Sequence, residues 1–412
     1  MQQPNRGKII ATAAFGVNLC LGVLYAWGVI SAALVDHLDW TVTQTQLPYM
    51  FACAFFALSM VPGGHLQDRL GPRRVIAAAA ILIGLGLFMS GVTMTVAGKI
   101  VFFGIVFGTG IGLGYAASTP AVVKWFDRHQ RGLVSGIVVS GFGLAPLFMA
   151  PLKTWLISLF DIRGAFMSLG GLFFLIILIL SRLIINPPAG FVPRTGGRVQ
   201  RTNTSDESTE WHWRRMLRTK QFYILWITFC FGTFAGLLII GQMSKLGLEK
   251  AGITAPFLLT SVYAVANTLG RIALGSISDR LGRERSLFML FVVQVITYIA
   301  FPYLRQPGTL MLGISIVGIT FGGMLTIFPA ITADYYGLRG MGMNYGLVFT
   351  AWGIGGVLGP LLGGIVRDMT GTYIMSYVIS ALLSAAGARL TLKLTASKRE
   401  KDSLVAVPAT ND

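Results

Sequence analysis

The chain has 412 residues, of which 54% are hydrophobic and only 12% are charged, with a mean hydropathy of +0.69. Soluble domains carry about 25% charged residues, so this composition excludes an ordinary soluble protein and indicates an integral membrane protein. The net charge of +17 would suit a nucleic-acid partner. We expect none, because the basic residues gather in loops between apolar segments, where topology and lipid headgroups account for them.

Apolar runs of 18 or more residues recur along the whole chain, and each is close to the roughly 20 residues that a membrane-spanning helix needs. They cover residues 8–33, 44–66, 74–96, 99–122, 132–154, 164–186, 220–244, 255–278, 286–304, 309–333, 341–365 and 372–395. The first run is too long and too weakly flanked for a cleaved signal peptide. The pattern therefore predicts an all-α membrane protein with twelve transmembrane helices.

The distribution of Arg and Lys over the loops predicts the orientation. Alternate loops are rich in basic residues, whereas the others hold only Lys99, Lys153, Arg163, Lys245, Lys250, Arg305 and Arg367. By the positive-inside rule, both termini are expected to be cytoplasmic. An even number of spans agrees with this.

Residues 187–218 divide the chain, because they combine Pro, Gly, polar and basic residues without an apolar period. We expect a six-helix bundle at 1–186, a cytoplasmic linker at 187–218, a second six-helix bundle at 219–396 and a cytoplasmic tail at 397–412. The two bundles share fragments: LQDRLGPRR at 66 recurs as ISDRLGRER at 277, and GFGLAP at 141 answers GGVLGP at 355. A nearly constant offset predicts a duplicated six-helix unit with a substrate site near the midplane.

Residues that carry covalent chemistry do not form a recognisable pattern. Cys20, Cys53 and Cys230 fall inside apolar runs without metal-ligand spacing, and the four histidines are scattered over loops and helix ends. We therefore expect no metal, no cofactor and no enzyme activity.

Arg271 is the main candidate for a functional residue, because it lies inside the apolar run 255–278. A guanidinium at that depth is costly and is usually retained for a charged ligand or a water-filled path. The alternative is a structural ion pair, but the middle of the apolar runs holds no Asp or Glu. The sequence therefore favours an anion site.

The repeated loop GGHLQDRLGPRR, with its second copy GSISDRLGRER, resembles the signature of the major facilitator superfamily over about the whole chain. The resemblance implies two rocking halves with a cytoplasmic gate, to which we assign Asp68, Arg69, Asp279, Arg280 and, at the end of the tenth span, Asp334. The alternative is that these loops only anchor the topology.

A closer resemblance is to the monocarboxylate transporters and the oxalate:formate antiporter group, carried by NTLGR at 267–271, WFDRHQRGLVSG, FGGMLTIFPAITADYYG and NYGLVFTAWG. It implies that Arg271 grips a carboxylate and that Asn267, one helical turn away, lies on the same face. Eukaryotic monocarboxylate transporters have an Asp, associated with proton coupling, in place of Asn267. The oxalate antiporter has a lysine in place of Trp352, so this chain offers one cation where that group has two.

Further site residues follow from the same resemblance. Tyr115 and Tyr25 would donate to the substrate, and an apolar subsite would be enclosed by Phe321, Leu325, Phe328, Phe349 and Trp352. The stripe of Phe321, Leu325 and Phe328 is equally consistent with core packing. Trp27 is a candidate of the same kind as Tyr25. Asn18 is a weaker candidate, for which the alternative is a hydrogen bond to a neighbouring helix.

These observations predict a transporter of a small monocarboxylate such as lactate or pyruvate, moved together with a proton by alternating access, in the inner membrane of a bacterium and as a monomer. The alternatives are an anion exchanger of the oxalate:formate type and a non-transporting carboxylate sensor.

Overall fold

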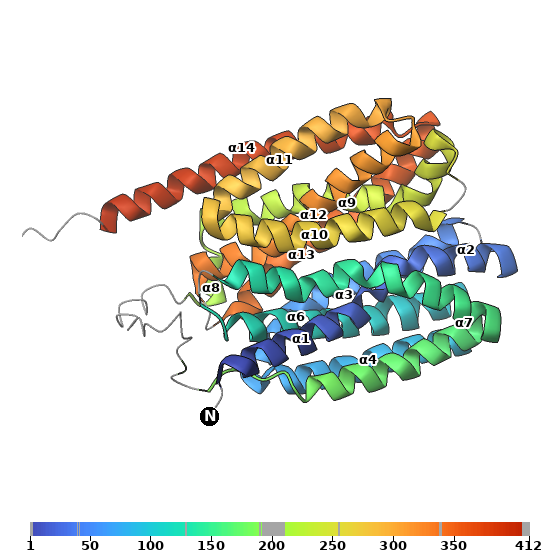
Figure 1. Ribbon diagram of the computed structural model, residues 1–412, viewed down its shortest axis with the longest axis horizontal. Helices are drawn as coiled ribbons and strands as arrows, with labels where there is room; N and C mark the ends of the chain where they lie inside the picture. The colour runs from blue at the N-terminus through green and yellow to red at the C-terminus, as the bar shows by residue number, and fades with distance from the viewer. Residues whose placement is uncertain are drawn as a thin grey trace, which may run out of the picture.

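The computed structural model describes residues 3–405 except 39, 41, 128–129, 189–190, 192–210, 254–255 and 338–339. Within these ranges every element of secondary structure is a helix, and there is no strand. Long helices run roughly parallel to one another (Figure 1). The N-terminus and α8 lie at one end of the bundle, called here the α8 end, and α2 lies at the other, called the α2 end.

The N-terminal half comprises the following elements: α1 (Gln3–Leu21), η1 (Gly22–Ala26), α2 (Trp27–Leu38), α3 (Val42–Leu70), α4 (Pro72–Val92), α5 (Val96–Lys99), the π-helical η2 (Ile100–Phe107), α6 (Gly108–Val123) and α7 (Arg131–Ser181). In this half α7 packs against α1 and α4, and α6 packs against α3. The first helix changes at η1 from an α-helix to a tighter 3₁₀ turn and then continues as α2.

Two helices are joined in α7, and a kink at Asp161 separates them. Asp161 has φ 62° and ψ −173°, which reverses the chain, and its Oδ1 accepts a hydrogen bond from the Gly164 N–H at 2.9 Å. This carboxylate caps the second helix, which runs back along the first (Figure 1). The predicted fifth and sixth spans, 132–154 and 164–186, are these two helices.

The C-terminal half comprises α8 (Trp213–Met216), α9 (Lys220–Ala251), α10 (Pro256–Leu281), α11 (Arg283–Ala300), η5 (Phe301–Tyr303), α12 (Pro307–Tyr336), α13 (Met341–Thr370) and α14 (Ile374–Val405). Here α10 packs against α12, α9 against α13, and α14 against α9 and α11. The helix α14 continues to Val405, past residue 396, where the sequence predicts the tail to begin.

Ten helices within the described ranges are long and apolar enough to cross a membrane. One of the ten is α7, which contains two helices, and α10, whose interior carries polar residues, brings the number to twelve. The expected fold, twelve helices in two six-helix halves, is confirmed. The short helix α8 lies inside the predicted linker, where the Trp211 N–H donates to the Tyr336 carbonyl at 3.0 Å.

The two halves meet along two helix pairs, α7 with α10 and α3 with α13. Glycines allow the backbones to touch at the α8 end of each pair. A Cβ on Gly64 would lie 2.0 Å from the Gly342 oxygen, and a Cβ on Gly275 would lie 2.5 Å from the Gly132 oxygen. Residues with a side chain at these positions would force the helices apart, so the close approach of the two backbones depends on glycine.

Two lysines that the sequence assigns to loops lie inside the bundle instead. Lys99 is buried at the end of α5, and Lys153 is buried on the first helix of α7, which continues to the kink at Asp161. The prediction that Lys153 lies in a loop is therefore wrong, because the helix continues past it to Asp161. The error arises because a charged residue lowers the hydropathy of a run whether or not the helix continues.

Candidate functional site

Arg271 is fully buried where α10 crosses α7, at the interface between the halves. Its Nε donates to Asn267 Oδ1 at 2.7 Å, and its Nη1 donates to the backbone carbonyl of Val139 on α7. The third nitrogen, Nη2, is buried and has no hydrogen-bond partner among the described residues. No carboxylate in the described part of the chain forms an ion pair with Arg271. One N–H group of a buried cation is therefore left for a ligand.

Glycines on two helices make room for this arginine. A Cβ on Gly143 of α7 would lie 2.5 Å from Asn267 Oδ1 and 3.0 Å from Arg271 Nε. A Cβ on Gly322 of α12 would lie 2.2 Å from the Asn267 carbonyl oxygen and 3.2 Å from Arg271 Cγ. Asn267 and Arg271 thus occupy a space that a side chain at position 143 or 322 would narrow.

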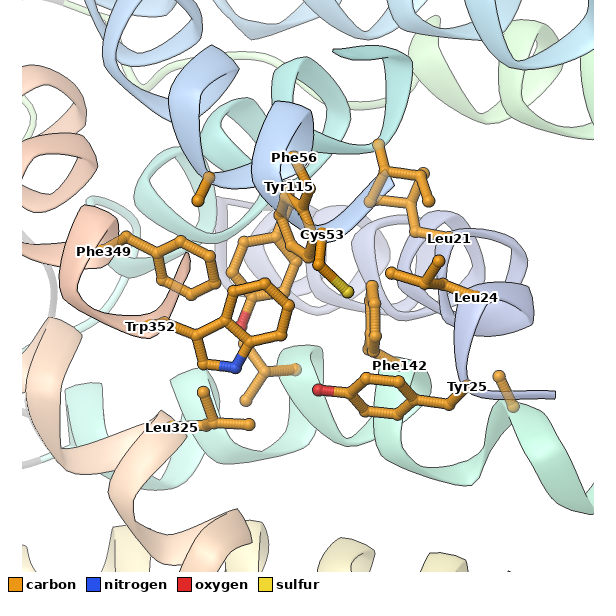
Figure 2. Packing of buried hydrophobic residues seen from close by; sticks show 14 of the residues in the cluster. Leu21, Leu24, Tyr25, Cys53, Phe56, Tyr115, Phe142, Leu325, Phe349 and Trp352 are labelled. Carbon is orange, nitrogen blue, oxygen red and sulfur yellow. The ribbon is translucent and has the colours of Figure 1, made fainter. Parts of the chain in front are cut away.

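A small cavity adjoins the guanidinium. It is lined by Arg271 and by seven aromatic or aliphatic residues, namely Tyr25, Phe56, Tyr115, Phe142, Leu325, Phe349 and Trp352. Both halves contribute, since Tyr25, Phe56, Tyr115 and Phe142 come from the N-terminal half. Figure 2 shows the Tyr25 hydroxyl and the Trp352 indole nitrogen pointing toward each other from opposite halves.

The aromatic rings around the cavity pack on one another. Phe56 is central: its ring centroid lies 5.0 Å from that of Trp352, 5.2 Å from that of Phe349 and 5.5 Å from that of Tyr115. The cavity volume is about 10 Å³, room for about one water molecule. This volume is too small for a carboxylic acid, and the arrangement seen here is called the closed state of the site.

The polar atoms of the site include a second donor without a partner. Trp352 Nε1 is buried and makes no hydrogen bond among the described residues, and Trp352 lines the same cavity as Arg271. Buried polar groups are seldom left unsatisfied unless a ligand or water binds them. The cavity therefore has two unsatisfied donors and an apolar wall, which suits an anion with a small organic part.

Six residues predicted from the sequence line this cavity, namely Tyr25, Tyr115, Arg271, Leu325, Phe349 and Trp352. Asn267 lies behind the guanidinium, where it holds Arg271 and donates from Nδ2 to the Tyr263 hydroxyl at 3.4 Å. Its part in this state is to position the arginine, whereas direct contact with substrate remains a prediction.

The sequence left two interpretations for the apolar stripe on α12, an apolar subsite and core packing, and its residues differ in which one they fit. Leu325 lines the cavity, whereas Phe328 stacks on Phe229 of α9 with centroids 4.0 Å apart. Phe321 packs near Tyr263 of α10, and its ring fills the space beside Gly236 of α9. The structure does not bring Phe321 and Phe328 to the cavity in this closed state.

The two remaining candidates, Trp27 and Asn18, do not line the cavity. Trp27 Nε1 donates to the Thr45 carbonyl on α3 at 3.0 Å. Asn18 Nδ2 donates to the Ala14 carbonyl at 2.8 Å and to Ser118 Oγ on α6 at 3.1 Å. Both side chains join helices of the N-terminal half, which is the alternative that the sequence left open for Asn18.

Sequence reasoning missed Phe56 and Phe142. Phe142 lies in the repeated fragment GFGLAP, whose counterpart GGVLGP follows Trp352 closely, so its position in the repeat was an available signal. Phe56 lies in an apolar run with several similar residues. Hydropathy does not distinguish a phenylalanine that faces a cavity from one that faces lipid.

The repeated loops meet the opposite half at the α8 end. Asp68 Oδ2 accepts a hydrogen bond from the Met343 N–H in the first turn of α13, and Asp279 Oδ2 accepts one from the Leu133 N–H in the first turn of α7, both at 3.1 Å. Helix N-termini have unpaired N–H groups and a partial positive charge, so each carboxylate stabilises the start of a helix in the other half. The two contacts are equivalent in the repeat and close this end.

The cations at these contacts differ from those predicted. Lys124 Nζ lies 3.7 Å from Asp68 Oδ1, while Arg283 Nη2 lies 2.6 Å from Asp279 Oδ1. Arg283 also donates from Nε to Asp334 Oδ2 at 3.2 Å, which brings the predicted Asp334 to the cluster. Arg69 and Arg280, which the sequence assigns to the gate, are exposed. The structure does not bring them together with the carboxylates.

Two helical halves that enclose a buried polar site at their interface, with reciprocal contacts at one end, define the architecture of a secondary transporter. The family model of the Major Facilitator Superfamily matches residues 10–360 and 258–408, and the chain belongs to this superfamily.

Individual relatives are distant but cover most of the chain. The chain is 28% identical over 343 residues to the uncharacterized MFS-type transporter YhjX of Escherichia coli K12, covering 82% of this chain and 83% of that protein. It is 26% identical to the oxalate:formate antiporter of Oxalobacter formigenes, over 92% of this chain and 89% of that protein. It is 25% identical to monocarboxylate transporter 13 of Rattus norvegicus, over 93% and 88%.

Solved structures support the fold. The proton:xylose symporter XylE superposes with a TM-score of 0.73 at 14% identity, covering 95% of this chain and 96% of that one. The human organic anion transporter MFSD10 superposes with a TM-score of 0.69, also at 14% identity, covering 93% and 99%. The chain therefore has the fold of these two proteins.

Proposed function

We propose that the protein carries a small monocarboxylate of the lactate or pyruvate type, together with a proton, across the inner membrane of a bacterium. The observation that carries this proposal is the buried Arg271, which lines an aromatic cavity and whose Nη2 has no hydrogen-bond partner among the described residues. A guanidinium binds a carboxylate through charge-assisted hydrogen bonds, and the apolar wall accepts the alkyl part. The protein works as a monomer, with the α8 end and both termini in the cytoplasm.

Substrate binding and separation of the halves are coupled in this proposal. In the closed state Arg271 Nη1 is bonded to Val139 of the opposite half. A carboxylate that takes two hydrogen bonds from the guanidinium replaces this contact as α7 moves away from α10. The arginine therefore contacts the other half of the protein when the site is empty and the substrate when it is occupied.

A second candidate is an exchanger that swaps a dicarboxylate for formate, which the similarity to the oxalate:formate antiporter supports. Uptake of labelled lactate, pyruvate, formate and oxalate into proteoliposomes separates the candidates. We expect lactate or pyruvate to accumulate when an inward proton gradient is imposed and no anion is present inside. Uptake that requires internal anion and ignores the gradient would favour exchange, and no uptake of any of the four would favour a sensor.

The contacts at the α8 end act as a gate in this proposal. Asp68→Asn and Asp279→Asn are each expected to lower the maximal rate about tenfold, the effect of one charge-assisted hydrogen bond, and to leave KM nearly unchanged. The reason is that both carboxylates hold the ends of the halves and lie away from the cavity. Initial rates over a range of substrate concentrations measure the two parameters.

Arg69→Gln and Arg280→Gln are the matched variants, because each of these arginines directly follows one of the two aspartates in the chain but is exposed. We expect smaller effects from them than from the aspartate variants. A raised KM with an unchanged maximal rate in Asp68→Asn or Asp279→Asn would contradict the gating assignment.

A further inference from the structure

Lys153 is a buried charge that the transport site described above does not use. Its side chain is 1% exposed on the first helix of α7, within a membrane-spanning segment. No ion pair joins it to a carboxylate among the described residues. An ammonium group inside a membrane protein is costly and is usually retained for a function.

The partners of Lys153 are two backbone carbonyls of the first helix. Its Nζ donates to the Val23 oxygen at 3.2 Å and to the Ala26 oxygen at 2.9 Å. These carbonyls lie on η1, the 3₁₀ turn that interrupts the first helix. The lysine thus binds the one turn at which this helix departs from α-helical geometry.

Tyr25 lies between the two carbonyls and lines the cavity beside Arg271. Its ring meets Phe142 of α7 edge to face, with centroids 4.8 Å apart. The same turn packs closely on α7 at Gly22, where a Cβ would lie 2.4 Å from the Phe142 oxygen. Fixing η1 against α7 therefore fixes where the Tyr25 hydroxyl lies in the cavity.

We propose that Lys153 is a positioning residue for substrate binding, which holds the 3₁₀ turn η1 so that Tyr25 points into the site. This inference rests on the proposed function only in that Tyr25 contacts the transported anion. The lysine itself does not line the cavity.

Lys99 provides a matched control. It is also fully buried in the N-terminal half and also donates to a backbone carbonyl, that of Ser90 on α4. Its ammonium lies 3.7 Å from the centroid of the Phe166 ring, on the second helix of α7. Neither contact involves η1 or the cavity, so Lys99→Met removes a buried charge without releasing Tyr25.

The test compares Lys153→Met with Lys99→Met in the full-length protein. We expect Lys153→Met to raise the KM of the transported anion about tenfold, the effect of one charge-assisted hydrogen bond, with a small change in the maximal rate. Lys99→Met should leave KM unchanged. An unchanged KM in Lys153→Met, or an equal rise in both variants, would overturn the proposal.

A double-mutant cycle tests whether the lysine acts through Tyr25. In a Tyr25→Phe background, Lys153→Met should raise KM much less than it does in the wild type, because the hydroxyl that it positions is gone. Effects that multiply independently would contradict the assignment. If Lys153→Met does not accumulate in the membrane, Lys153→Leu takes its place, because leucine also lacks a donor: a raised KM supports positioning, whereas a wild-type KM overturns it.

The two hydrogen bonds from Lys153 to the Val23 and Ala26 carbonyls are called here the clamp. Hydrogen exchange of the purified protein tests this clamp without any substrate. Amides of residues 22–27 should exchange faster in Lys153→Met than in the wild type, and Lys99→Met should match the wild type in this segment. Unchanged exchange would overturn the clamp even if transport falls. Faster exchange in a protein that carries no carboxylate would keep the clamp and reject the proposed substrate class.

Discussion

Replacing Arg271 with lysine is expected to lower carboxylate uptake about 100-fold, the loss of about two charge-assisted hydrogen bonds, while the protein still reaches the membrane. The guanidinium has three nitrogens. Nε donates to Asn267 and Nη1 donates to the Val139 carbonyl, while Nη2 has no hydrogen-bond partner among the described residues. A lysine is a point charge without this planar fork, so it cannot serve the two halves and the substrate together. Initial uptake rates in proteoliposomes measure the loss.

Arg305→Lys is the matched control for this substitution, since Arg305 is exposed in the loop that follows η5. It should transport at the wild-type rate. Near-normal uptake by Arg271→Lys, in protein reconstituted at equal density, would remove Arg271 from the substrate site and with it the main support for an anionic substrate.

Oxalate is expected to bind about 100-fold more weakly than lactate or pyruvate, because the unpaired carboxylate of a dianion costs several kcal/mol in a buried site. Among the described residues that line the cavity, only Arg271 is charged. Lys153, a second buried cation, is bonded to the backbone carbonyls of Val23 and Ala26 and does not line the cavity. Competition of unlabelled oxalate against labelled lactate uptake measures the difference.

Trp352→Lys tests the same argument by adding a cation to the cavity wall. This variant should gain oxalate binding and lose lactate transport, since the ammonium pairs with the second carboxylate and the indole no longer encloses an alkyl group. Trp352→Phe is the control, because it keeps an aromatic ring and adds no charge. If the wild type already binds oxalate as tightly as lactate, the monocarboxylate assignment fails and exchange takes its place.

Much of the site was predictable because a few signals are strong in a membrane sequence. Arg271 is prominent in an apolar run, and the spacing of four residues puts Asn267 beside it on any α-helix. The repeated loops mark Asp68 and Asp279, whose contacts with the two helix N-termini are equivalent in the structure. These predictions depend on local helical geometry, which the chain specifies at short range.

The charges near the membrane boundary were assigned less well. The sequence assigns Arg69 and Arg280 to the expected gate together with Asp68 and Asp279, whereas the cations in contact with these carboxylates are Lys124 and Arg283. Adjacent residues on a helix point in different directions, so the neighbour of a buried aspartate is often exposed. Lys153 was assigned to a loop because hydropathy records a charge and gives no information on whether the helix continues past it.

The sequence by itself determined the class of protein and the twelve helices, because apolar length and repeated motifs are properties of the chain read in order. It also singled out Arg271 as the candidate for an anion site, because a charge inside an apolar run is visible in the same way. Only the tertiary structure decided which aromatic residues surround that arginine. Phe56 and Phe142 enter the site, and Phe321 and Phe328 pack elsewhere, because the crossing of α7 with α10 and of α3 with α13 determines which helix faces meet. The clamp of Lys153 on η1 likewise joins residues 127 and 130 positions apart, and no local pattern encodes such a contact.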